Sequence, residues 1–364
     1  MSLTANKGEW SEIYALFKLL SDRKLVIGDE HFNHIPDLFF PILEILREEK
    51  CRTLRFDTSQ DNQNVFICSE NGDILNKISS RAFEEQAKHL LTKIKAGAKS
   101  AFEIPETEIF MSSAHCTSIK ASSKDKADIR IVIHDIQTGH TALQNFSIKS
   151  DLGSKPTLFN SNKEGTNFIY DLSGGNLSRE QIDEINAIDT HHKIRDRVSK
   201  ILGFGAKISF KRVEAQVLDH NLRMVDIALP EILAYMILEY FSGNGSKFSE
   251  LAKRMDENNP LNFPFETKNF YTHKIKRFLS DVALGLMPGK MWDGIYQANG
   301  GYIVVRQDGE LLCYHVFYRN QFDAYLLNAT KLETPDPERH HFGKICEDSD
   351  GKPILKLNLQ VRFR

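Results

Sequence analysis

The alternation of apolar and polar residues along the chain is most regular between residues 127 and 150. Isoleucines occupy every second position of residues 129–133, and Phe146 and Ile148 repeat this spacing. A period of two is typical of a strand that buries one of its faces. The segment 134–145 between the two runs is polar and contains a Thr-Gly turn signal. The pattern therefore predicts a β-hairpin over residues 127–150.

This hairpin is expected to bring three chemically useful side chains together. Asp128 stands at the start of the first strand, and Ser147 and Lys149 lie two positions apart on the second. Residues two apart in a strand face the same side, so we expect both to lie near Asp128. An acid and a lysine held side by side suit the binding of a divalent metal ion and the activation of a water molecule. The other interpretation is that they are simply strand-end residues that face water.

The remaining periodicities predict a mixed α/β protein. Apolar spacings of three and four predict helices at residues 7–21, 38–49, 81–99, 178–202, 224–241, 246–256 and 267–286, and a short helix or turn at 322–328. The helix at 224–241 is expected to be interrupted at Pro230. Short or alternating apolar runs predict strands at residues 25–27, 53–56, 65–69, 73–75, 166–170, 208–217, 301–306, 310–317, 342–346 and 354–362. Asn6 and Glu9 form a capping box for the first helix, and Glu12 lies on the same face as Glu9.

The order of these elements predicts a core sheet flanked by helices, with an additional C-terminal region of helices and β-hairpins. Residues 242–245 (Ser-Gly-Asn-Gly) are the best linker candidate in the chain. We therefore expect a body over residues 1–242, which carries the hairpin, and a separate C-terminal part over residues 246–364.

Composition and charge exclude several classes of protein. The 364 residues, with 41% hydrophobic and 26% charged, are typical of a globular protein of one large domain or two ordinary ones. The net charge of -2 gives no general affinity for nucleic acid, so DNA binding has to depend on local basic surfaces. The five scattered cysteines contain no CxxC pair, which indicates neither a disulfide framework nor a zinc site. No apolar run is long enough for a signal peptide or membrane span, so we expect a cytoplasmic protein without a membrane partner.

The arrangement Asp128…Ser147-x-Lys149 fits the hairpin core of the PD-(D/E)xK nucleases. In such a site Asp128 would bind Mg²⁺, which prefers oxygen ligands, and Lys149 would position or activate the attacking water. The sequence departs from the usual pattern because Ser147 stands where an acid is typical, so the site lacks one carboxylate. Glu9 or Glu12 of the first helix could supply it. The other interpretation of Glu9 is that it only caps the helix.

Several longer stretches together resemble the HpaII-type family of type II restriction endonucleases. They are NKGEWSEIY at 6–14, FSIKS at 146–150, GSKPTL at 153–158, TNF at 166–168 and LNLQVRF at 357–363. The resemblance covers essentially the whole chain. It implies a homodimeric, Mg²⁺-dependent enzyme that cleaves short palindromes in double-stranded DNA, with a partner DNA methyltransferase. The family's namesake reads CCGG, and the C-terminal part would then serve DNA recognition.

Polar and basic residues in four places are candidates for DNA contacts. The loop after Lys149 contains groups that could hold phosphates: Ser150, Ser154, Lys155, Thr157 and Asn160. Three basic segments add His191, His192 and Lys193, then Lys274 and Arg277, then Arg339, His340 and Arg362. The competing interpretation of the loop is a turn that satisfies its own hydrogen bonds. The competing interpretation of the basic segments is an ordinary solvated surface. The histidine pairs lack the further ligand spacing that a zinc site needs.

Two other functions remain open at this point. A non-cleaving DNA-binding protein with a decayed nuclease site is suggested by Ser147, although the retained Asp128 and Lys149 argue against it. A nuclease of the same superfamily that acts in repair would recognise DNA structure and not sequence. A gene for a cytosine methyltransferase beside this one would favour the restriction enzyme.

Overall fold

A computed structural model describes residues 2–49, 52–98, 100–120, 127–163, 165–175 and 177–364. The chain divides into two compact units, each made of two segments. Unit 1 comprises Met1–Pro156 and Tyr296–Tyr325, and unit 2 comprises Thr157–Ile295 and Leu326–Arg364. This division differs from the one expected at residues 242–246, which lie inside unit 2. Among the described residues, no helix is both long and apolar enough to cross a membrane.

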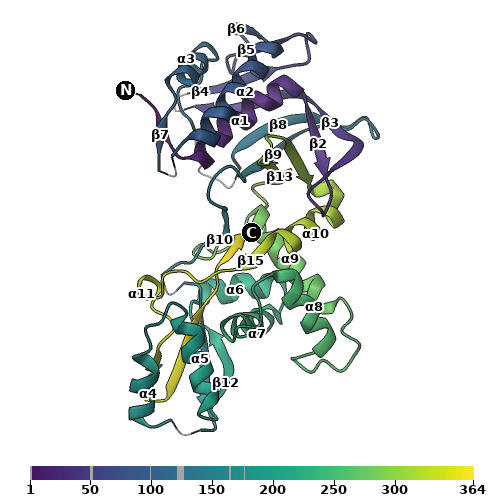
Figure 1. Ribbon diagram of the computed structural model, residues 1–364. Coiled ribbons are helices and arrows are strands. Elements are labelled where there is room, and N and C mark those ends of the chain that lie inside the picture. Colours follow the sequence, from purple (N-terminus) through teal and green to yellow (C-terminus); the bar gives the residue numbers. More distant parts are fainter. Residues whose placement is uncertain (1, 50–51, 99, 121–126, 164, 176) are drawn as a thin grey trace. The chain divides into compact units, whose positions relative to one another are not determined.

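Within its described residues, unit 1 contains a closed barrel of six strands (Figure 1). Around the ring these are β2 (Lys24–Gly28), β14 (Leu311–His315), β13 (Gly301–Val305), β9 (Thr141–Ser150), β8 (Ile129–His134) and β3 (His34–Glu49). The β13–β9 and β14–β2 pairs are parallel, and β2 closes the ring by pairing antiparallel with β3. The sheet continues from β3 through β4 (Arg52–Asp57), β5 (Asn64–Cys68) and β6 (Ile74–Ser79).

The predicted hairpin is confirmed as β8 and β9. The two strands are antiparallel, with Ile129 opposite Phe146 and His134 opposite Thr141. Ile129, Phe146 and Ile148 are buried in one hydrophobic core, as their alternation predicts. The hairpin is therefore a central part of the barrel, because β9 also pairs with β13.

The first helix is also confirmed. Helix α1 (Lys7–Asp22) begins with the complete Asn6–Glu9 capping box. Its apolar stripe is buried, and Phe17 packs against Phe83 of α2 (Ser80–Ala96) with ring centroids 5.7 Å apart. The remaining elements of unit 1 are β1 (Thr4–Ala5), β7 (Phe102–Glu103), α3 (Pro105–Ser113), a 3₁₀ turn at Val316–Tyr318 and the start of α10 (Arg319–Ala329).

The predicted helix at 38–49 is wrong, since these residues belong to the long strand β3. The sequence LFFPILEILREE fits either period, and Pro41 would be tolerated in a first helical turn. In the structure β8 and β4 pair with β3 on its two sides, and Phe40, Ile42 and Ile45 are buried. Tertiary pairing therefore overrides the local helix signal.

Unit 2 combines helices with two small sheets. One sheet has the order β12 (Lys207–Val213), β11 (Asn167–Ser173), β17 (Pro353–Asn358) and β16 (Ile345–Glu347), and the other β10 (Thr157–Phe159), β18 (Val361–Phe363) and β15 (Thr330–Leu332). Its helices are α4 (Arg179–Asn186), α5 (Lys193–Gly203), α6 (Gln216–Val225), α7 (Leu229–Phe241), α8 (Phe248–Asn258), α9 (Phe270–Leu284) and α11 (Pro337–His340). The mixed α/β class is thus confirmed.

Two predicted helices of unit 2 are each divided in the structure. The segment 178–202 forms α4 and α5, and the buried Arg197 donates to the carbonyl oxygens of Asn186 and Ile188 between them. These hydrogen bonds replace the helical ones across the break. The segment 224–241 is also divided, close to the interruption predicted at Pro230, because α6 ends at Val225 and Pro230 lies in the first turn of α7.

The buried His315 gives unit 1 a testable pH dependence. Its Nδ1 accepts a hydrogen bond from the Phe317 amide (3.0 Å), and its Nε2 contacts Gln144. Burial lowers the pKa of His315 from 6.5 to about 4, although the charge of Asp135 opposes the shift. The unfolded chain therefore binds more protons between these pH values. The free energy of unfolding should fall by about 3 kcal/mol as the pH drops from about 6.5 to about 4.

Chemical denaturation at several pH values measures this contribution. The His315→Gln variant should lose about that much of the pH dependence, whereas His31→Gln at an exposed position should keep it. An unchanged pH dependence in the His315→Gln variant would contradict the assignment.

Candidate active site

The hairpin connects Asp128, Ser147 and Lys149 through a chain of hydrogen bonds. The Lys149 Nζ donates to the Ser147 Oγ (2.7 Å), and this hydroxyl donates to the Asp128 Oδ2 (2.9 Å). The Ile148 amide donates to the same carboxylate oxygen at 2.7 Å. Ser147 is buried, so its hydroxyl fixes the spacing between the carboxylate and the ammonium group. The expectation that these three residues lie together is confirmed.

The environment of Lys149 favours the loss of its proton. Burial lowers the pKa of Lys149, and the negative charges of Asp128 and Glu12 only partly oppose this. Its Nζ also lies 5.1 Å from the centre of the Tyr302 ring, whose strand β13 is paired with β9. A lysine whose charged form is destabilised in this way is suited to exchange protons with a bound molecule.

Glu12 faces the same group of charges from helix α1. Burial, and then the negative charge of Asp128, raise the pKa of Glu12 to about 7, while Lys120, Arg47 and Lys149 oppose the rise. The hydroxyls of Ser11 and Ser150 are 2.8 Å apart, which attaches α1 to the end of β9 beside Lys149. Glu12 therefore lies close enough to Asp128 for the two carboxylates to repel each other.

Glu9 has a different environment from Glu12. Its Oε2 accepts a hydrogen bond from the Asn6 amide (2.8 Å), and its Oε1 forms an ion pair with Lys120 at 2.8 Å. Burial raises the pKa of Glu9, but the hydrogen bonds from Lys120 and Asn6 outweigh this and lower it overall. Both oxygens thus already have partners, whereas no described residue forms a hydrogen bond or ion pair with Glu12. Of the two glutamates, Glu12 is the better candidate for a metal ligand.

Sequence reasoning missed Lys120, which stands before the hairpin without any motif around it. Its ammonium group neutralises Glu9, and the charges of Glu12 and Asp128 help to raise the pKa of Lys120. The candidate site therefore contains two lysines and three carboxylates.

The residues present fit a magnesium ion, although no group of three or more histidine, cysteine or acidic side chains in the described residues has a metal-binding arrangement. Mg²⁺ is commonly held by one or two carboxylates, with water and phosphate as its other ligands. Asp128 and Glu12 supply such a pair, and their mutual repulsion would be relieved by a cation between them.

The candidate DNA contacts differ in how available their side chains are. The hydroxyl of Ser150 and the side chain of His340 are buried. Four basic residues form ion pairs with neighbouring acids: Lys155 with Asp151, Lys193 with Asp189, Lys274 with Asp226, and Arg362 with Glu333. Thr157 is half-buried and lies opposite Arg362 in the sheet.

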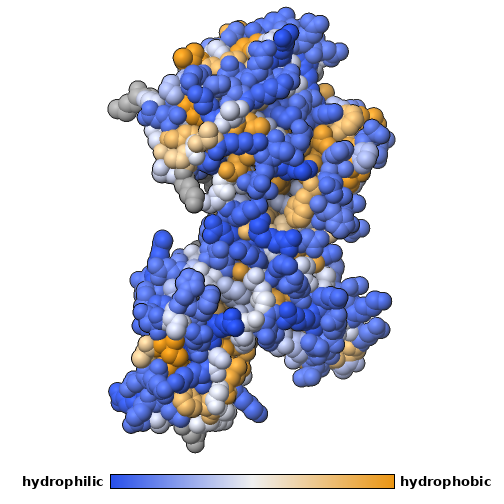
Figure 2. All heavy atoms as spheres, in the orientation of Figure 1, coloured by the Kyte–Doolittle hydropathy of each residue, from blue (hydrophilic) through white to orange (hydrophobic). Residues whose placement is uncertain are grey.

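Six of the candidates are exposed, namely Ser154, Asn160, His191, His192, Arg277 and Arg339. Figure 2 shows hydrophilic residues over much of the visible surface, with apolar residues in smaller groups. Exposure makes these six available to a ligand without identifying the ligand.

Comparison with known proteins gives the class and the family of this chain. A family model described as HpaII restriction endonuclease matches residues 6–363. The chain is 42% identical over 362 residues to the type II restriction enzyme HpaII of Haemophilus parainfluenzae, covering 99% of this chain and 98% of that protein. The comparison with solved structures gave no match.

These similarities define a type II restriction enzyme, a site-specific deoxyribonuclease. The chain belongs to the HpaII restriction endonuclease family, as the stretches at both ends and in the centre of the sequence indicate.

Proposed function

We propose that this enzyme makes Mg²⁺-dependent double-strand cuts in DNA at CCGG, the sequence that the family's namesake reads. The observation that carries the proposal is the hydrogen-bonded series Asp128–Ser147–Lys149, with Glu12 facing it from α1. The family membership supports DNA as the substrate. The cytoplasm is the expected location.

The proposed roles follow from the geometry of the hairpin, which we interpret as a PD-(D/E)xK-like core. When bound at Asp128 and Glu12, Mg²⁺ would neutralise charge on the scissile phosphate and lower the pKa of water. Lys149 would hold the attacking water and give or take its proton, because burial lowers its pKa. Ser147 would position Lys149 against Asp128, and so takes a place usually filled by an acid.

A homodimer is the economical way to cut both strands of a palindrome. The two strands of CCGG present the same sequence, so two copies related by a two-fold axis would each place one site on one strand. A methyltransferase that modifies the same sequence would protect the host DNA.

Digestion of phage DNA with and without Mg²⁺ tests the proposed function. We expect discrete fragments, only with the metal ion, whose ends map to CCGG. A smear of products, or nicking only at DNA structures, would favour the repair nuclease. Sequence-specific binding without any cleavage would favour the decayed site.

The two N-terminal glutamates should differ in their importance. Glu12→Gln removes a candidate metal ligand. We expect it to raise the activation barrier by about 4 kcal/mol, which lowers the single-turnover cleavage rate roughly 1000-fold. Glu9→Gln removes a capping and ion-pairing carboxylate, and should mainly cost about 1 kcal/mol of stability.

Cleavage rates at saturating Mg²⁺, with thermal unfolding of each variant, separate these effects. If Glu9→Gln were the inactive variant and Glu12→Gln the active one, the choice of ligand would be reversed.

A further inference from the structure

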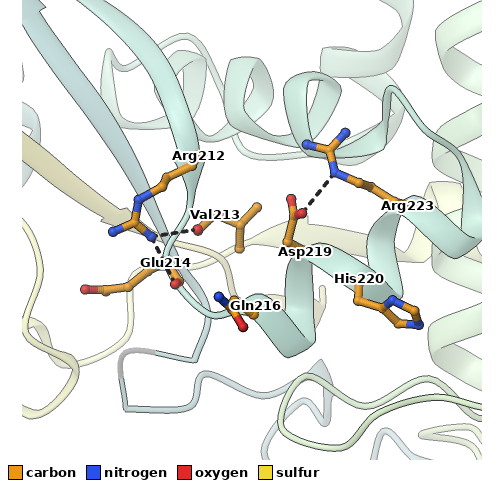
Figure 3. Close-up of a pocket in the computed structure, with 7 residues that line it drawn as sticks. All are labelled: Arg212, Val213, Glu214, Gln216, Asp219, His220 and Arg223. Carbon is orange, nitrogen blue, oxygen red and sulfur yellow. Dashed lines mark hydrogen bonds and ion pairs between the residues drawn. The ribbon is translucent and has the colours of Figure 1, made fainter.

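Unit 2 contains a polar pocket of about 600 Å³ between the end of β12 and helix α6 (Figure 3). Its lining includes the side chains of Arg212, Glu214, Gln216, Asp219, His220 and Arg223. Figure 3 shows Arg212 on the strand, Gln216 at the start of α6, and His220 and Arg223 further along the helix. None of these residues stands out in the sequence, because they do not form a run of like charge.

The acids that line the pocket are already paired. Glu214 forms an ion pair with Lys356 and accepts a hydrogen bond from the side-chain amide Nδ2 of Asn167 at 2.9 Å. Asp219 pairs with Arg223 at 2.9 Å. The charges of both acids are therefore offset by cations within unit 2.

Arg212 differs from the other cations because its partners in the described residues are all neutral. Its Nη1 donates to the carbonyl oxygens of Val213 (3.2 Å) and Glu214 (3.1 Å). In the described part of the chain, no carboxylate forms an ion pair with this exposed guanidinium. The pocket thus has one cation whose charge remains for a ligand.

The same hydrogen bonds orient the guanidinium. With Nη1 held by two carbonyl groups, the edge formed by Nε and Nη2 remains free for two parallel hydrogen bonds. This fork matches the O6 and N7 acceptors that guanine presents in the major groove. A side chain that is already oriented also loses less conformational entropy on binding.

Gln216 and His220 lie one helical turn apart on α6 and line the pocket beside Arg212. Both side chains are exposed, and each carries groups that donate and accept hydrogen bonds. Arg223 is less available, because its Nε donates to Asp219 and its Nη1 to the carbonyl oxygen of Ile227.

We propose that this pocket reads DNA sequence, and that Arg212 binds the major-groove edge of a guanine in the recognition site. The inference rests on the proposed function and deepens it, since it assigns a base-reading residue that lies in a different unit from the candidate catalytic hairpin. Gln216 and His220 provide the adjoining contacts. A contact from Arg212 to a phosphate would instead carry no sequence information.

A double-mutant cycle between protein and DNA tests this assignment. Short duplexes containing CCGG are prepared with guanine or with 7-deazaguanine, which lacks N7, at each guanine in turn. The dissociation constant is measured without Mg²⁺ for the wild type and for Arg212→Ala. At one guanine, 7-deaza substitution should weaken wild-type binding about 10-fold. Arg212→Ala should bind the unmodified duplex at least as weakly as the wild type binds the 7-deaza duplex. It should also no longer distinguish guanine from 7-deazaguanine at that position.

Two further variants keep the test decisive. Arg212→Lys retains the charge without the fork, so it should also lose the discrimination while keeping its affinity for unrelated DNA. Arg179→Ala, which removes another exposed arginine of unit 2, should behave as the wild type.

Several results would overturn the inference. Full discrimination at every guanine by Arg212→Ala or Arg212→Lys would show that Arg212 does not contact a base. An equal loss of affinity for CCGG and unrelated DNA in the Arg212→Lys variant would do the same. If the wild type showed no preference for CCGG, both the proposed recognition site and the role of Arg212 would be contradicted. If the wild type preferred CCGG but the variants kept their discrimination, only the role of Arg212 would be contradicted.

Discussion

Replacing Lys149 with alanine is expected to lower the rate of DNA cleavage by roughly 100- to 10,000-fold, the range of a positioned proton donor or acceptor. The variant removes the ammonium group that donates to Ser147 and leaves the bond from Ser147 to Asp128 in place. Single-turnover cleavage of a duplex with one CCGG site measures the rate. Binding to the same duplex without Mg²⁺ should remain largely intact.

Lys88→Ala is the matched control, because it removes an exposed lysine of α2 in the same unit. It should cleave at the wild-type rate. If Lys149→Ala cut DNA as fast as Lys88→Ala, the candidate active site would be misplaced.

The second large effect is expected from Asp128→Asn. Asparagine has the same shape, and its amide oxygen can still accept hydrogen bonds from Ser147 and the Ile148 amide. The fold should therefore persist, while the loss of charge weakens metal binding. A loss of several kcal/mol of transition-state stabilisation corresponds to a rate roughly 1000-fold lower.

Titration of the cleavage rate with Mg²⁺ separates metal affinity from chemistry in this variant. The half-saturating concentration should rise together with the loss of rate. Asp37→Asn is the control, since Asp37 is exposed and has a left-handed φ of 58° that asparagine tolerates. A normal Mg²⁺ dependence in Asp128→Asn would exclude Asp128 as a ligand.

The local parts of the site could be predicted from the sequence. Alternating isoleucines and the polar turn identify the hairpin, and strand geometry alone then places Ser147 and Lys149 beside Asp128. The capping box at Asn6 and Glu9 is equally local and is confirmed. The sequence left the choice between Glu9 and Glu12 open, and the contacts of Glu9 in the structure favour Glu12 as the metal ligand.

The parts that depend on distant contacts could not be predicted. β9 pairs with β13, about 150 residues further along the chain, and β2 closes the barrel on β3. β3 was predicted as a helix for the same reason, because its local sequence fits either period and its pairing with β8 lies far along the chain. Arg212 could not be singled out from the sequence, because its distinctive feature is that no acid among the described residues pairs with it, and only the folded chain reveals this.

The sequence and the structure lead to different interpretations of Ser147. In the sequence pattern it occupies the position of an acid, so the site lacks a carboxylate and a decayed site is suggested. In the structure it is buried and bonds to both Asp128 and Lys149. This arrangement supports an intact site in which the second carboxylate comes from Glu12 of α1.

The central claim is that Asp128 and Glu12 together hold the metal ion beside Lys149. Anomalous diffraction from crystals of the protein–DNA complex soaked in Mn²⁺ tests it directly, because Mn²⁺ accepts the same oxygen ligands. We predict an anomalous peak bonded to carboxylate oxygens of both Asp128 and Glu12, next to the scissile phosphate. A peak bonded to Glu9 and not to Glu12, or one away from Asp128, would contradict the account.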